Sequence, residues 1–256
     1  MLPKGELFLE KKEDVRLNKY LADQGVCSRR EADRLIESGK VFVDGSPAGL
    51  GDRITMEMQV VVNGKPVIKA TKKVVLAFYK PEGVTCTEKD EHAEITITEY
   101  MNYPIRVTYA GRLDKESEGL MLMSNDGDLI QKITRAEHEH EKEYQVKLHK
   151  KITPEFLEQM KQGVFLKELK VKTKPCQIRQ TGPYSVEIVL TQGLNRQIRR
   201  MCKELGYQVV KLKRTRIMNI RLDGLKYGEY RELTEAERTE LYQLCEKTTA
   251  VKKRSK

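Results

Sequence analysis

The 256-residue sequence has no tryptophan, only four histidines, and five cysteines that are scattered singly. No C-x-x-C pair and no metal-ligand spacing occurs, so the sequence predicts neither a zinc site nor a disulfide framework, and we expect no metal. The cysteines are expected to be small buried hydrophobic residues, with a nucleophilic cysteine as the weaker alternative. The longest apolar run, residues 74–79, is far shorter than the roughly 20 residues of a membrane helix. Because residues 1–10 also lack a signal-peptide pattern, we expect a cytoplasmic protein without membrane association.

Positive charge is unevenly distributed along the chain. Lysine and arginine total 48 against 38 acidic residues, and nine of the ten charged residues between 192 and 221 are basic. A localised basic surface is typical of proteins that bind phosphate backbones, although a solvated basic face is the alternative. Residues 248–256 are also basic and have no hydrophobic pattern, which predicts a disordered tail.

The first part of the chain has the pattern of a small α+β domain over residues 16–67. Apolar spacing predicts a helix over residues 16–22, and Ser28 with Glu31 forms the sequence of a capping box that opens a second helix. Residues 41–43 and 60–62 are expected strands, each followed by a turn at Asp44-Gly45 or Asn63-Gly64. Residues 1–15 are an N-terminal extension, and the polar residues 68–73 suggest a linker.

A larger α+β domain is expected over residues 74–247. Strands are predicted at residues 74–79, 120–124, 144–148, 171–174, 184–190, 207–213 and 216–222. Helices are predicted to begin at Thr153-Pro154 and at the capping box of Thr234, and to span residues 196–205. Because the elements do not alternate regularly, we expect a mixed, mostly antiparallel sheet flanked by helices.

The first domain resembles the RNA-binding module first known from ribosomal protein S-four. The matching residues are Arg16-Leu17-Asn18-Lys19-Tyr20-Leu21, Ser28-Arg29-Arg30-Glu31-Ala32, Gly39-Lys40-Val41 and Val43-Asp44-Gly45. Arg29 and Arg30 fall in the first turn of a helix, where backbone N–H groups favour an anion. The resemblance implies RNA contacts by Arg16, Lys19, Arg29 and Arg30.

Residues 111–120, Gly-Arg-Leu-Asp-Lys-Glu-Ser-Glu-Gly-Leu, place Asp114 between basic neighbours just before an apolar strand. Nearby positive charge favours the carboxylate form, and a carboxylate can act as a nucleophile or a base. On residue chemistry alone, a salt-bridged loop aspartate is the stronger interpretation.

The same decapeptide is similar to the catalytic motif of pseudouridine synthases of the RsuA and RluF type. Three further motifs of that family match in order, at Lys80-Pro81-Glu82-Gly83, at Lys142-Glu143-Tyr144 and at residues 193–201. The resemblance implies that Asp114 attacks the target uridine, Arg199 holds its carboxylate and Tyr144 stacks on the ring and serves as base. It implies no cofactor. Without the motifs, Tyr144 would be interpreted as a core tyrosine and Arg199 as a solvated helix residue.

A uridine inside a base stack must be flipped out to reach Asp114, and a cation is then wanted to fill the gap. We expect Arg112 to take this role, and Arg196 and Arg200 to contact RNA.

Residues 135–144 and 213–219 look most like the RluF branch, which implies a uridine of 23S ribosomal RNA as substrate and tyrosine tRNA as a second one. The acidic stretch at residues 90–94 departs from that branch. The alternatives are a non-catalytic RNA-binding assembly factor and a nucleoside hydrolase that uses Asp114. A monomer is expected, because no exposed heptad pattern or long apolar patch is present.

Overall fold

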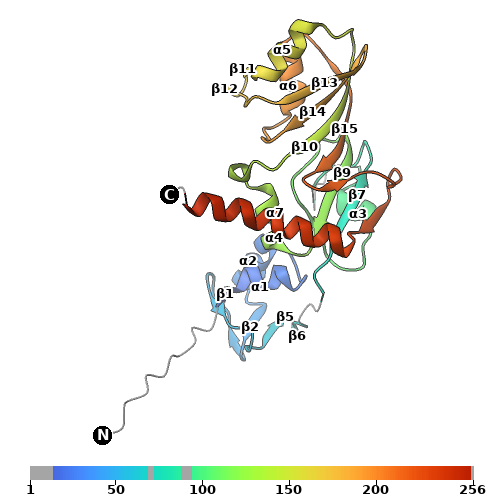
Figure 1. Cartoon of the computed structure of the whole chain (residues 1–256). Coiled ribbons are helices and arrows are strands. Elements are labelled where there is room, and N and C mark those ends of the chain that lie inside the picture. The colour runs from blue at the N-terminus through green and yellow to red at the C-terminus, as the bar shows by residue number, and fades with distance from the viewer. Residues whose placement is uncertain (1–13, 69–71, 88–93, 255–256) are drawn as a thin grey trace. The chain divides into compact units, whose positions relative to one another are not determined.

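A computed structural model describes residues 14–68, 72–87 and 94–254 of the chain. The chain divides into two compact units, residues 1–72 and residues 73–256. Figure 1 labels most of the elements of both.

The first unit packs two helices against short antiparallel strands. Helices α1 (Leu17–Asp23) and α2 (Arg29–Glu37) bury Leu17, Leu21, Ala32 and Ile36 in one core with Val41. The strands pair in two groups, namely β1 (Val15–Arg16) with β4 (Arg53–Ile54), and β3 (Ser46–Pro47), β2 (Val41–Val43), β5 (Val60–Val62) and β6 (Lys65–Pro66) in that order.

The cap of α2 forms only half of the predicted capping box. The Ser28 hydroxyl accepts a hydrogen bond from the backbone N–H of Glu31 over 3.2 Å. The Glu31 carboxylate pairs with Arg34 one turn later on the same helix. Because Arg34 competes for this carboxylate, Glu31 does not accept a hydrogen bond from the backbone N–H of Ser28, which would complete the box.

In the described part of the second unit, nine strands form one mixed and mostly antiparallel sheet, which confirms the expected fold class. Its main order is β13 (Gln177–Gly182), β14 (Ser185–Leu190), β10 (Lys142–Leu148), β15 (Val209–Ile217), β9 (Glu118–Ser124), β7 (Val75–Lys80) and β17 (Tyr230–Glu232). β8 (Thr108–Tyr109) pairs with β9, and β16 (Ile220–Arg221) pairs with β15. Only the β15–β9 pair is parallel among these ladders. A separate two-stranded ribbon joins β11 (Phe165–Leu166) to β12 (Val171–Lys172).

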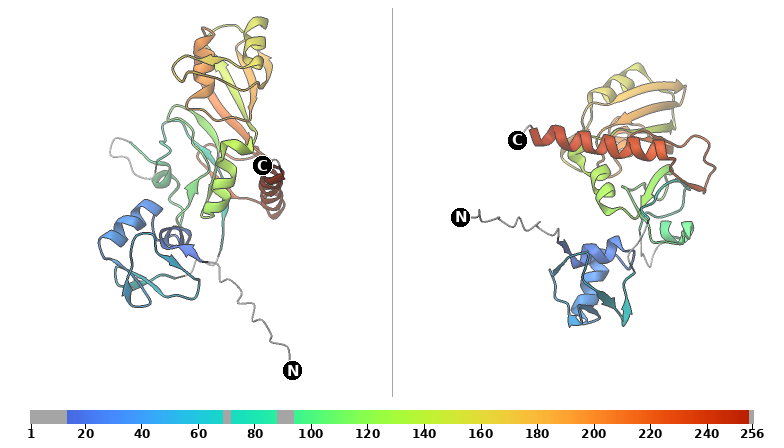
Figure 2. Two further views of the ribbon diagram at one scale, coloured as in Figure 1. Left: turned by 90° about the vertical axis from the view of Figure 1, so that its left-hand side faces the viewer. Right: turned by 60° about the horizontal axis from the view of Figure 1, so that its bottom comes forward.

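Helices cover the two faces of this sheet unequally (Figures 1 and 2). On one face, α5 (Pro154–Gln162) and α6 (Gln197–Glu204) pack over β10 and β14, and α3 (Ile97–Met101) packs over β7 and β9. On the other face, α4 (Gly127–Thr134) and α7 (Glu235–Arg254) cover the β7–β9 part. A short 3-10 helix, η1 (Ala136–His138), follows α4.

The second unit differs from its sequence-based outline at three points. Residues 207–222 were expected to form two strands, yet β15 runs unbroken through Arg214 and Thr215 and only the short β16 follows. Arg214 is buried and donates to the carbonyl of Leu120, so pairing with β9 carries the strand through this basic stretch. β13 was missed because its polar residues lie exposed at the sheet edge. α7 continues to Arg254, so residues 248–254 are helical and not a disordered tail, because an established helix extends at little cost per residue.

The cysteines behave as small core residues. Cys86, Cys176, Cys202 and Cys245 are buried and Cys27 is partly so, all as free thiols. Burial raises the pKa of the Cys176 thiol to about 11. This disfavours the thiolate and with it the nucleophilic alternative.

Candidate active site

The loop between β8 and β9 carries Asp114 and is held in place by a buried lysine. Lys80, at the end of β7, is fully buried, and its Nζ donates to the carbonyls of Ser117 and Pro81, each over 2.7 Å. Burial lowers the pKa of this ammonium. Within the loop, the N–H of Ser117 donates to the carbonyl of Asp114. The Lys80-Pro81 motif therefore anchors the backbone that presents Asp114.

Two arginines at the start of α6 face the Asp114 carboxylate. Oδ2 of Asp114 lies 3.7 Å from Nε of Arg199 and 3.8 Å from Nη1 of Arg196. The predicted approach of Arg199 to Asp114 is therefore present in the structure. Arg199 itself is held by the loop, because its Nη2 donates to the carbonyl of Glu116 over 2.9 Å and to Oγ of Ser117 over 3.0 Å. Its side chain is only 14% exposed, which strengthens these contacts.

Glu116 is a site residue that sequence reasoning missed. Its carboxylate forms an ion pair with Arg196 and lies 3.9 Å from Nε of Arg199. The hydrogen bond from Arg196 holds the pKa of Glu116 below its ordinary value. Two carboxylates thus share two guanidiniums, and Arg196, expected only to contact RNA, also belongs to the Asp114 cluster. The signal in the sequence was the pair of acidic positions, 114 and 116, within one short loop.

Arg196 reaches this cluster through an unusual backbone conformation. It is the N-cap of α6 with φ +50° and ψ +34°, a left-handed conformation that is uncommon outside glycine. Such conformations cost free energy and are concentrated at functional sites.

A small cavity opens beside the Asp114 carboxylate. Its walls combine charged and apolar side chains from the Asp114 loop, β10, β14, β15 and α6. It is lined by Arg112, Leu113, Asp114, Ser117, Tyr144, Leu190, Gln192, Gly193, Leu194, Arg196, Gln197, Ile198, Arg199 and Leu212. Tyr144 lies where β10 and β15 have a register irregularity, and it packs against two hydrophobic clusters of the unit. Four of the predicted site residues, Arg112, Tyr144, Arg196 and Arg199, therefore surround Asp114.

Other predicted site residues lie elsewhere. Arg200 does not line this cavity. It donates to Asn195 and pairs with Glu168, which also pairs with Lys203. Arg16, Lys19, Arg29 and Arg30 belong to the first unit, where the three arginines are exposed and Lys19 pairs with Asp23 over 2.8 Å. Of the acidic stretch at residues 90–94, only Glu94 falls among the described residues, and it pairs with Lys115.

The residues that the structure describes contain neither a metal cluster nor a membrane-spanning helix. No group of three or more His, Cys, Asp or Glu side chains is placed to hold a metal ion there. No helix among them is long and apolar enough to cross a membrane.

Comparison with known proteins places this architecture in a family. A model described as RNA pseudouridylate synthase matches residues 74–204, and a model of the S4 domain matches residues 15–60. The chain is 46% identical to the dual-specificity RNA pseudouridine synthase RluF of Escherichia coli strain K12, over 92% of this chain and 81% of that protein.

Two more similarities span most of both chains. A Bacillus subtilis protein named ribosomal large subunit pseudouridine synthase B is 37% identical over 86% of this chain and 92% of its own length. A crystal structure titled as a pseudouridylate synthase superposes with a TM-score of 0.65 at 29% identity, covering 90% of this chain and 99% of that one. These findings confirm the resemblance noted in the sequence. The chain belongs to the RNA pseudouridine synthase family, whose members are isomerases, and it carries an S4 domain ahead of the synthase domain.

Proposed function

We propose that this enzyme converts a uridine of large-subunit ribosomal RNA to pseudouridine, with Asp114 as the nucleophile. The observation that supports the proposal best is the Asp114 carboxylate beside the guanidiniums of Arg196 and Arg199, at a cavity that Tyr144 also lines. The reaction detaches uracil from the ribose, rotates it and rejoins it through carbon 5, so the hydrogen of carbon 5 leaves and no electrons are exchanged.

Each charged group has a distinct task in this proposal. Asp114 is 29% exposed on its side chain, so a flipped-out nucleotide can reach it, whereas Arg199 is held by the loop and keeps the carboxylate oriented. The contacts of 3.7 and 3.8 Å are longer than hydrogen bonds, which leaves the carboxylate oxygens available to attack. Positive charge on both guanidiniums also stabilises the carboxylate as the leaving group when the bond to it breaks.

Tyr144 and Arg112 act on the base and on the RNA around it. Tyr144 lines the cavity with a ring against which a planar base can stack. Its phenolic oxygen takes the proton from carbon 5 while the hydroxyl passes its own proton to water. Arg112 lines the same cavity and is exposed, as a cation that occupies the space left by the flipped uridine must be. Arg16, Lys19, Arg29, Arg30 and Arg200 supply further RNA contacts.

The proposed substrate class follows from the relatives. One similar protein is named as dual-specificity and another as a large-subunit enzyme. We therefore propose large-subunit ribosomal RNA as the main substrate. Tyrosine tRNA is proposed as a second one from the resemblance of residues 135–144 and 213–219 to the RluF branch. The enzyme works as a monomer in the cytoplasm and needs no cofactor in this proposal.

The test uses ribosomal RNA transcribed with tritium at carbon 5 of uracil, because forming the new bond must expel that hydrogen into water. Wild type is compared with Asp114→Asn, and with Asp223→Asn as a control at an exposed aspartate outside the cavity. We expect stoichiometric release by wild type and the control, and none by Asp114→Asn. Intact RNA binding without release by any variant would favour a binding factor. Free uracil in solution would favour a hydrolase.

A further inference from the structure

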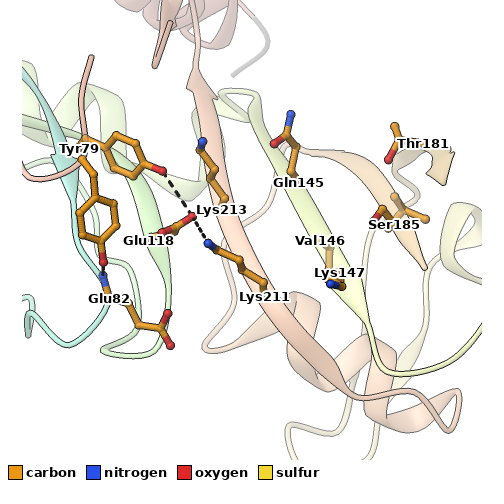
Figure 3. A pocket seen from close by; sticks show the side chains of 12 residues that line it. Tyr79, Glu82, Glu118, Gln145, Val146, Lys147, Thr181, Ser185, Lys211 and Lys213 are labelled. Atoms are coloured by element: carbon orange, nitrogen blue, oxygen red, sulfur yellow. Dashed lines mark hydrogen bonds and ion pairs between the residues drawn. The ribbon is translucent and has the colours of Figure 1, made fainter. Parts of the chain in front are cut away.

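A second hollow, of about 710 Å3, lies in the synthase unit. Figure 3 shows the side chains that line it. Its volume is within the range of ligand sites in proteins. Its lining residues come from the central strands and from the turns beside them, and most carry polar side chains. They are Tyr79, Glu82, Glu118, Gln145, Val146, Lys147, Thr181, Ser185, Val186, Lys211, Lys213 and Tyr227. None of them lines the cavity beside Asp114.

The hollow is on the opposite face of the sheet. Tyr144 and Leu212 line the Asp114 cavity, whereas their neighbours Gln145, Lys211 and Lys213 line the hollow. Successive side chains of a strand point to opposite faces, so the two cavities are separated by the sheet. On the face of the hollow, α4 and α7 pack over β7 and β9. The other part of this face carries polar side chains from β10, β14 and β15. We call this part the reverse face; it includes Gln145, Lys147, Ser185, Lys211 and Lys213.

The lysines of the reverse face are arranged at a cost in free energy. Lys147 of β10 is the direct register partner of Lys211 of β15, and like charges opposite each other destabilise a sheet. Glu118 forms an ion pair with Lys211 over 3.1 Å and is the register partner of Lys213, but no carboxylate among the described residues lies within ion-pair distance of Lys147 or Lys213. Lys213 instead lies with its Nζ 5.0 Å from the ring centre of Tyr79. A bound anion would offset the repulsion among these lysines.

An aromatic side chain is exposed at the rim of the hollow. Tyr227 is 54% exposed and packs edge-on against Tyr79, with ring centres 5.2 Å apart. Its hydroxyl accepts a hydrogen bond from the backbone N–H of Glu82 over 3.0 Å, which fixes the ring. A fixed, exposed tyrosine beside lysines is the combination with which proteins bind single-stranded nucleic acid, through stacked bases and paired phosphates.

We propose that the reverse face binds a second, single-stranded segment of RNA, with its phosphates on Lys147, Lys211 and Lys213 and a base stacked on Tyr227. Lys211 and Lys213 are two positions apart on a strand, roughly 7 Å, so they can contact neighbouring phosphates of one strand. RNA is favoured over an acidic protein because the exposed aromatic ring adds a stacking surface and because this family already acts on RNA. Through the hollow, the enzyme would contact RNA beyond the nucleotide that it modifies.

The binding test uses a fluorescent eight-nucleotide oligoadenylate, which contains no uridine and so is independent of catalysis by Asp114. The full-length Lys147→Ala/Lys213→Ala variant is compared with Lys151→Ala/Lys161→Ala, which removes two exposed lysines near α5 that do not line the hollow. We expect the first variant to raise Kd about tenfold and to reduce the salt slope by about 1.4, near 0.7 for each lost phosphate contact. Lys147→Arg/Lys213→Arg should keep wild-type affinity and slope.

A second variant separates stacking from charge. Tyr227→Ala should raise Kd at least about fivefold with an unchanged salt slope, because stacking releases no counterions. Thermal unfolding of all variants, whose changed side chains are exposed or half-exposed, checks that they fold. Equal weakening by the two lysine-to-alanine pairs, or wild-type affinity in Lys147→Ala/Lys213→Ala, would overturn the proposal. Tighter binding of polyglutamate than of oligoadenylate would overturn it in favour of an acidic protein partner.

Discussion

Gly119 lies in a close backbone contact between β9 and β15, and replacing it with alanine tests how the fold supports the Asp114 loop. Gly119 has φ +121° and lies in β9 opposite Arg214 of β15. A Cβ at this position would lie 2.3 Å from the backbone oxygen of Arg214 and 2.4 Å from its nitrogen. Because both neighbours are backbone atoms, no rotamer change relieves the clash, and the parallel β9–β15 pair must separate.

The magnitude follows from two additive effects. An unfavourable backbone conformation costs roughly 1–3 kcal/mol, and overpacking costs about the same again. A loss of about 2–6 kcal/mol lowers Tm by at least about 5 °C in a unit of this size. Activity should fall further, because Asp114 is only five residues away and a displacement of about 1 Å at a catalytic group costs on the order of 100-fold in rate.

The assay is thermal unfolding followed by circular dichroism, together with single-turnover tritium release below the transition. Gly182→Ala is the matched control, since its Cβ would meet only Ser185 Cβ at 3.8 Å. Equal Tm and equal rates for Gly119→Ala and Gly182→Ala would refute the reasoning.

Two further predictions concern single cations. Arg199→Lys should lower kcat by about 10–100-fold with little change in KM, because one ammonium cannot contact Glu116, Ser117 and Asp114 together. Single-turnover kinetics check this prediction, and a wild-type rate would contradict it. Burial lowers the pKa of Lys142 to about 8, below its value in the unfolded chain. Between pH 8 and 10.5 the unfolded chain therefore binds more protons than the folded one. The free energy of unfolding rises with pH in this window, by on the order of 3 kcal/mol. Urea unfolding across this window should show that rise in wild type and lack it in Lys142→Met, and parallel profiles would count against it.

Short-range patterns in the sequence predicted many of the helices and strands. Apolar spacing and caps placed α1, α2 and α6 within a few residues of their bounds and located the start of α5, because capping residues lie within the first or last turn of a helix. Hydrophobic runs likewise located β7, β9, β10 and β14. Polar β13 was missed because the side chains of this edge strand are mostly exposed, so it has no alternation of apolar and polar residues.

For the site, the sequence identified Asp114, Tyr144 and Arg199 through motifs that lie far apart along the chain. Their proximity is a property of the sheet, because β15 pairs with both β9 and β10 and so carries the Asp114 loop to Tyr144. The ion pair between Glu116 and Arg196 depends on the left-handed backbone of Arg196. The opposed lysines of the reverse face depend on the register between β10 and β15. Such long-range register is set by the packing of the whole sheet, which is why only the tertiary structure decided it.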